Sequence, residues 1–186
     1  MSAYKFRVLI DTASNEEIFR DVLISSDENL ETFYQTIIDA FDFKNDQMAS
    51  FYKSNDDWDK GQEVALMDMG FNEEAEAVLI MNETSIKSLI TEKNQKIILV
   101  HDFMRMWCFL IELVATTSKT PMSPEIVLSV GAAPKEDSKS LDSNQGLEFG
   151  ETLDLGNDFD DIFADDDEDD DLDLDSFEEG SENDFY

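Results

Sequence analysis

The strongest constraint on the fold is an acidic tract at the end of the chain. Residues 148–186 contain 19 Asp or Glu and no Lys or Arg. A segment with this excess of one charge cannot bury enough apolar surface to fold compactly, and such a composition is typical of disorder. The stretch that begins at Lys135 is polar, as in a linker. We therefore predict one folded domain over residues 1–134, followed by a polar linker and a disordered acidic tail over residues 135–186.

The charge of the whole chain restricts its partners. The 186 residues include 45 acidic and 13 basic side chains, which gives a formal net charge of −32. Binding to a nucleic-acid backbone depends on clustered Lys and Arg, and anionic membrane surfaces attract the same residues. We therefore expect no direct contact with nucleic acid or membrane, and a basic protein is the expected partner. The sequence leaves the oligomeric state open.

Cysteine content and hydropathy predict a cytoplasmic protein. Cys108 is the only cysteine, so folding does not require an internal disulfide or an oxidising compartment. The opening residues, MSAYKFRVLIDTASNEE, lack the basic region and the longer apolar region of a signal peptide. The apolar runs of the chain are well short of the roughly 18 residues that predict a membrane-spanning helix.

An amphipathic helix is the clearest local prediction. Apolar residues recur three and four positions apart, which places them on one helical face. They are Leu30, Phe33, Tyr34, Ile37, Ile38 and Phe41. The polar residues from Ser25 to Asn29 precede this run and supply capping side chains and negative charge at the helix start.

Strands are predicted on both sides of this helix, because apolar and β-branched residues alternate or run together there. The predicted strands cover residues 4–11, 18–25, 48–54, 63–70, 76–82, 96–103, 106–116 and 125–130, with a short helix at 84–90. The first two strands and the pair around residue 104 are expected to form hairpins. The order β-β-α-β, short elements, β-β predicts an α+β fold with a mixed or antiparallel sheet packed on one main helix. Its opening resembles a β-grasp fold.

The segment HDFMRMWCFLIEL, residues 101–113, contains the only histidine and the only cysteine. A thiolate nucleophile needs a nearby base or cation, so a pair of Cys108 and His101 is conceivable. However, Cys108 lies in the apolar run MWCFLI, where a free cysteine behaves as a small core residue. One His and one Cys cannot complete a tetrahedral zinc site without carboxylates. We therefore expect no catalytic residue, no metal site and no cofactor.

Three charged residues around the same hairpin could instead form a catalytic site. Asp102, Arg105 and Glu112 could form an acid–base site if the pKa of one carboxyl group were raised. The simpler expectation places Arg105 at the turn and both acids in solvent. Trp58 could gate a cleft near these residues, although we expect it to cover one end of the core.

Apolar residues are interleaved with the carboxylates of the tail. Phe159, Ile162 and Phe163, together with Asp160 and Asp161, form the candidate interaction segment. The three apolar residues would share one face if the segment became helical on a partner. Alternatively, the tail only increases solubility, or binds calcium loosely, because it lacks the spacing of a calcium-binding loop.

Several short islands in residues 4–137 together form a pattern, and its main residues are Arg20, Phe51, Asp102, Phe103, Trp107, Pro134, Glu136 and Asp137. These islands resemble the plasmid pRiA4b Orf-three-like family. The closing loop GAAPKED, residues 131–137, resembles the family's Gly-x-x-Pro-Pro-Glu-Asp, although its composition does not fit a phosphate cradle. This chain has Gln47, Met104, Arg105, Phe109 and Ala133 where the family pattern has other residues, mostly polar ones.

The resemblance implies a family without an assigned biochemical function and a chain that has lost any shared chemistry. We therefore expect a non-enzymatic α+β domain that acts in protein interaction. The alternatives are a small-ligand or enzymatic cleft near Asp102, Arg105 and Trp107, and a DNA mimic that binds a basic nucleic-acid-binding protein.

Overall fold

The structure is a computed structural model that describes residues 2–14, 16–68 and 79–139. The candidate interaction segment of the tail, from Phe159 to Phe163, lies outside the described residues, as does most of the predicted linker. The described chain continues past Pro134 to Lys139, and Glu136 and Lys139 form hydrogen bonds with Lys44 and Met106.

The order of secondary-structure elements follows the predicted order closely. The structure contains β1 (Ala3–Ile10), β2 (Phe19–Ser25), α1 (Leu30–Ala40), β3 (Ala49–Ser54), β4 (Lys60–Ala65), β5 (Leu79–Ile80), α2 (Ile86–Leu89), β6 (Lys96–His101), β7 (Trp107–Thr117), β8 (Glu125–Val130) and the 3-10 helix η1 (Glu136–Ser138). The opening β-β-α order, which resembles the start of a β-grasp fold, is present.

The strands form one eight-stranded sheet in the order β5-β4-β3-β6-β7-β1-β2-β8. β4 and β5 run parallel, and every other neighbouring pair runs antiparallel. The predicted hairpins β1–β2 and β6–β7 are both present. The prediction of an α+β fold with a mixed sheet and one main helix is therefore confirmed.

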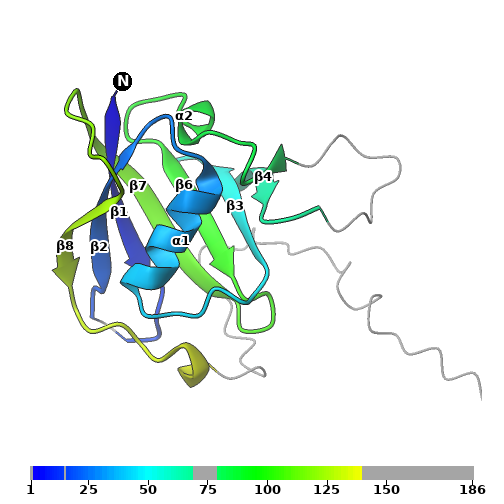
Figure 1. The fold of residues 1–186 in the computed structure, drawn as a ribbon. Coiled ribbons are helices and arrows are strands. Elements are labelled where there is room, and N and C mark those ends of the chain that lie inside the picture. Colours follow the sequence, from blue (N-terminus) through cyan, green and yellow to red (C-terminus); the bar gives the residue numbers. More distant parts are fainter. Residues whose placement is uncertain (1, 15, 69–78, 140–186) are drawn as a thin grey trace, which may run out of the picture. The chain divides into compact units, whose positions relative to one another are not determined.

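Helix α1 lies across one face of the sheet (Figure 1). Its start is capped by Asn29, whose side-chain oxygen accepts a hydrogen bond from the main-chain N–H of Thr32 at 2.8 Å. The buried residues of the helix belong to the main apolar core, as the periodicity predicted. Phe33 is the centre of this contact, since its ring lies 4.8 Å from that of Phe6 and 5.8 Å from that of Phe51.

The two central strands β6 and β7 are apolar on both faces. Ile97 and Leu99 belong to the main core, whereas Ile98 and Val100 belong to a second cluster. Because successive side chains of a strand point to opposite faces, this second cluster lies on the far face of the sheet from α1. Cys108 is part of this cluster, and Trp58 packs against it. The expectation of Cys108 as a small core residue is confirmed.

Several boundaries differ from the sequence prediction, among them those of β4 and β6. β4 begins at Lys60, three residues before the predicted strand at 63–70, and ends at Ala65. The side-chain oxygen of Asn55 accepts main-chain hydrogen bonds from Asp57 and Asp59, which closes the chain tightly enough for β4 to pair at once with β3. β6 ends at His101, because the turn into β7 begins one residue later.

β8 forms one edge of the sheet, and each of its six residues is exposed. These include four large apolar side chains that are 36–46% exposed: Ile126, Val127, Leu128 and Val130. Within the described ranges, no helix is both long and apolar enough to cross a membrane.

Candidate functional site

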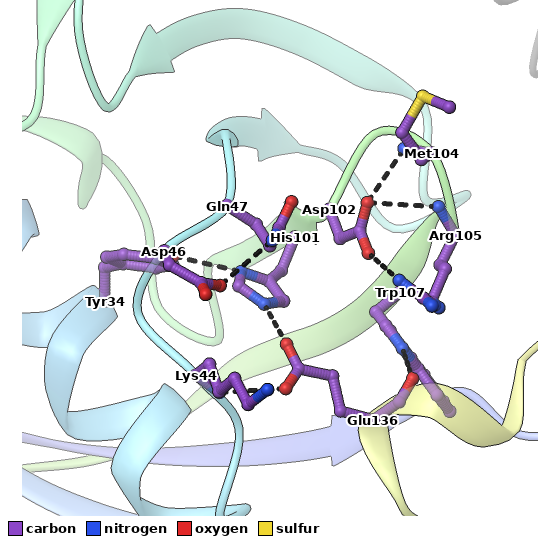
Figure 2. A network of polar contacts seen from close by, with 10 residues as sticks. All are labelled: Tyr34, Lys44, Asp46, Gln47, His101, Asp102, Met104, Arg105, Trp107 and Glu136. Atoms are coloured by element: carbon purple, nitrogen blue, oxygen red, sulfur yellow. Dashed lines mark hydrogen bonds and ion pairs between the residues drawn. The ribbon is translucent and has the colours of Figure 1, made fainter.

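A buried hydrogen-bond network is centred on His101, the last residue of β6 (Figure 2). The Nδ1 atom of His101 lies 3.0 Å from the Tyr34 hydroxyl, and Nε2 lies 3.2 Å from the carboxylate of Glu136. Burial lowers the pKa of His101, which favours the neutral ring. In that state, Nε2–H donates to Glu136 while Nδ1 accepts from Tyr34, so a single tautomer satisfies both contacts.

Glu136 joins the closing loop to three other parts of the domain. Besides its contact with His101, its carboxylate accepts a hydrogen bond from the main-chain N–H of Lys44 at 3.0 Å. Its main-chain oxygen accepts one from the indole N–H of Trp107 at 3.0 Å. Lys139 adds a hydrogen bond from its ammonium group to the main-chain oxygen of Met106 at 2.5 Å. The closing loop is therefore docked on the β6–β7 turn and on the segment after α1.

Asp102 organises the turn between β6 and β7. It has a φ of 58°, a left-handed conformation that Asp tolerates better than most residues. Its carboxylate accepts hydrogen bonds from the main-chain N–H groups of Met104 and Arg105 and pairs with Nη1 of Arg105 at 3.1 Å. Asp102 is only 2% exposed. The expectation that this acid faces solvent is therefore wrong, because the side chain is needed to close the turn.

Glu112 does not join Asp102 in an acid–base pair. It is half-buried in β7 and lies opposite Arg7 of β1 and Lys96 of β6. It lies five positions along β7 from Trp107, a length of roughly 16 Å at the usual rise per residue. The structure places Arg105 at the turn, as predicted, but it does not bring the two carboxylates together.

A cavity of about 580 Å³ lies beside the network. It is lined by the end of α1, the segment after it, the β6–β7 turn and the closing loop. The lining residues are Arg20, Ala40, Phe41, Asp42, Lys44, Asp46, Gln47, Arg105, Ala133, Pro134, Lys135, Glu136 and Asp137. This volume is within the range of small-molecule sites, which is about 300–1,000 Å³.

The residues singled out from the sequence occupy three different places. Arg20, Pro134, Glu136 and Asp137 line the cavity directly, and Asp102 supports it through Arg105. Phe51 and Trp107 are buried in the main core. Phe103, Trp58 and Cys108 belong to the cluster on the far face, where burial raises the pKa of the Cys108 thiol. Cys108 therefore does not face His101.

Sequence reasoning missed Tyr34 and Lys44 as members of the site. Tyr34 was assigned only to the buried face of the helix, and it is buried there. Its hydroxyl could have indicated a role in a polar network, since a buried tyrosine needs a hydrogen-bond partner. Lys44 contributes through its main-chain N–H, which no side-chain pattern could reveal.

The His101 network predicts that the protein loses stability in mild acid. The folded-state pKa of His101 lies below its ordinary value of 6.5, because burial outweighs the opposing charges of Glu136, Asp102 and Asp46. The unfolded chain therefore binds a proton more readily, so this contribution to stability is present above pH 6.5 and is lost as pH falls below it. We expect the free energy of unfolding, measured with urea, to fall between pH 7.5 and 5.5. In a His101→Gln variant, the fall should be smaller, and an equal fall in both proteins would contradict this assignment.

Comparisons with known proteins place this architecture in a family. A model described as plasmid pRiA4b ORF-3-like protein matches residues 2–170. The chain belongs to this family. The pRiA4b ORF-3-like match extends beyond the islands at residues 4–137 and includes much of the acidic tract.

This pRiA4b ORF-3-like chain also resembles a solved structure. It is similar to the crystal structure of a protein of unknown function, MM3350, from Methanosarcina mazei Go1, with a TM-score of 0.61 and 15% sequence identity. The similarity covers 75% of each chain and, at this identity, concerns the fold. No curated protein matches the chain. The family is one of uncharacterised function, so any assignment of activity depends on the site itself.

Proposed function

We propose that this chain is a non-enzymatic protein-interaction module, located in the cytoplasm, whose acidic tail binds a basic partner protein. The placement of the reactive side chains supports the absence of catalysis. Both ring nitrogens of His101 are engaged in hydrogen bonds, and Cys108 is buried with a raised pKa. The Asp102 carboxylate stabilises the β6–β7 turn by accepting hydrogen bonds from its main-chain N–H groups.

The charge of the tail is the observation that carries the proposal. The 19 acidic residues of residues 148–186 would attract a basic surface from a distance and raise the rate of encounter. Phe159, Ile162 and Phe163 then supply apolar contacts that charge alone cannot provide. The folded domain would present this segment to its partner.

A pull-down from cytosol tests the proposal. The baits are the full-length protein, a truncation to residues 1–147, and a full-length variant with Phe159, Ile162 and Phe163 replaced by serine. We expect the full-length protein alone to retain a partner at low salt and to release it at high salt. The serine variant keeps every charge, so its loss of the partner would separate apolar contact from electrostatic attraction.

Other outcomes of the same experiment would change the assignment. A partner that the truncation retains equally well would place the interaction on the folded domain and contradict the role of the tail. Displacement of the partner by duplex DNA would favour a DNA mimic, because the partner would then use one surface for both ligands.

A second candidate function is the binding of a small ligand in the cavity. The observation that favours it is that Arg105, held by Asp102, lines the same cavity as Arg20, which comes from a distant strand. Convergence of polar side chains from several elements on one cavity is typical of ligand sites. Trp58 is not among the lining residues, so it does not gate this cavity.

A further inference from the structure

The most unusual charged residue of the cavity is Arg20. It is 7% exposed, and among the described residues its guanidinium donates only to main-chain carbonyl oxygens, those of Phe19, Ala40, Val130 and Gly131, at 2.8–3.2 Å. No carboxylate forms an ion pair with it among the residues that the structure describes. Buried charges are normally paired, because neutral acceptors do not balance the lost hydration of an ion.

The charge of Arg20 is weakly compensated by its surroundings. Its guanidinium carbon lies 4.7 Å from the ring centre of Phe41, which is a favourable but modest contact. Burial lowers the pKa of Arg20, and the charge of Asp42 opposes this effect without forming an ion pair. An anion in the cavity would supply the missing counter-charge.

Arg105 brings a second guanidinium to the same cavity. Its Nη1 atom is bound to Asp102, but its Nε atom is buried without any hydrogen-bond partner in the described structure. An unsatisfied buried donor is destabilising, because it has lost its hydrogen bonds to water. One cavity is therefore lined by two guanidinium groups, one from β2 that lacks a counter-charge and one from the β6–β7 turn that lacks a hydrogen-bond acceptor.

The charges of the remaining lining residues restrict the ligand further. The lining contains four basic and four acidic side chains, namely Arg20, Lys44, Arg105, Lys135, Asp42, Asp46, Glu136 and Asp137. Arg20 is buried and Arg105 and Glu136 are half-buried, whereas three acids, Asp42, Asp46 and Asp137, and two lysines, Lys44 and Lys135, are exposed. The inner residues carry one more positive than negative charge and the exposed residues one more negative than positive. A negative group is therefore favoured on the inside of the cavity and a positive group near the solvent.

We propose that the cavity binds a small zwitterion with one carboxylate and one ammonium group, the chemistry of a free amino acid. The carboxylate pairs with the guanidinium groups of Arg20 and Arg105, which match its planar geometry. The ammonium group lies toward the exposed acids Asp42, Asp46 and Asp137. This inference rests on the second candidate function, small-ligand binding in the cavity, and assigns its ligand class.

Binding can be tested with the twenty common L-amino acids as probes. Each is added at millimolar concentration to the full-length protein, and binding is followed by thermal shift and by titration calorimetry. We expect at least one amino acid to bind. Its carboxamide and its N-acetyl derivative, each lacking one charge, should bind about tenfold more weakly or worse, since charge-assisted hydrogen bonds are lost.

Variants assign the binding to the cavity. Arg105→Gln should weaken binding about tenfold, whereas Arg105→Lys, which keeps the charge, should weaken it less. Lys93→Gln removes an exposed charge outside the lining and should leave binding unchanged. Arg20→Gln should abolish binding if the variant folds. If it does not fold, the Arg105 variants alone test the assignment.

Negative results distinguish two claims, namely that the cavity binds a small ligand and that this ligand is a zwitterion. If inorganic phosphate or acetate binds with Arg105 dependence while every amino acid fails, the cavity is a ligand site and the zwitterion is wrong. If amino acids, phosphate and acetate all fail to bind, both the ligand class and the small-ligand function are overturned, and Arg20 only links main-chain carbonyls. Equal binding by an amino acid and its carboxamide would also overturn the pairing with Arg20 and Arg105.

Discussion

Replacement of Phe33 by alanine is expected to lower the free energy of unfolding by about 3–5 kcal/mol. Phe33 is fully buried on α1, and its ring contacts Phe6 of β1 and Phe51 of β3. These two strands are separated in the sheet by β6 and β7, so one side chain links distant parts of the core to the helix. Its removal leaves a cavity that a rigid sheet cannot close by moving a single element.

Chemical denaturation, followed by tryptophan fluorescence, measures this loss. Typical domains have only about 5–15 kcal/mol of stability, so the Phe33→Ala variant should unfold at much lower denaturant concentration. Phe33→Leu, which fills most of the space, should lose less. Gln35→Ala is the matched control, since Gln35 is exposed on the same helix, and its effect should stay within about 0.5 kcal/mol. Equal losses in Phe33→Ala and Gln35→Ala would refute the role assigned to Phe33.

Replacement of Asp102 by alanine is expected to lower the free energy of unfolding by about 2–4 kcal/mol, from three sources. Alanine is strained by about 1–2 kcal/mol in the left-handed conformation, for which Asp102 has a φ of 58°. In addition, the N–H group of Met104 loses its acceptor, and that of Arg105 keeps only the main-chain oxygen of Asp102. Arg105 also loses its carboxylate partner.

Asp102→Asn separates these contributions. Asparagine tolerates the same conformation and offers an oxygen to the two N–H groups, but it removes the negative charge. We therefore expect it to lose about 1 kcal/mol, measured by urea denaturation at neutral pH. If the asparagine and alanine variants are equally unstable, the ion pair with Arg105 dominates and the turn geometry contributes little.

The elements of this fold could be predicted from sequence where burial follows a simple period. The helical spacing from Leu30 to Ile38 and the alternating residues of β1 each have one buried face. In β2 the alternation is broken by Asp21, which is fully buried and forms ion pairs with Lys5 and Arg7. β6 and β7 are buried on both faces, which explains their nearly continuous apolar runs. The predicted start of β4 at residue 63 lies three residues too late, because the Asn55 side chain shortens the preceding turn through local hydrogen bonds.

The site could not be predicted in the same way, because it depends on contacts between distant segments. Arg20 and Gly131 are 111 positions apart, yet they share a hydrogen bond. Charged residues such as Asp102 and Glu136 are usually solvated, and only the folded turn shows that Asp102 is buried. The family resemblance selected several of the right positions, including Arg20 and Glu136, but gave them no physical role.

The exposed edge strand β8 could pair with another molecule, and the strong negative charge of the chain opposes such pairing. Within the described residues β8 pairs only with β2, and an edge strand with exposed apolar side chains is a template on which another chain can add. Two such edges would meet only by bringing together two molecules of net charge −32, and this repulsion opposes their pairing at low ionic strength. We therefore expect concentrated solutions to self-associate first where salt screens the carboxylates or acid protonates them.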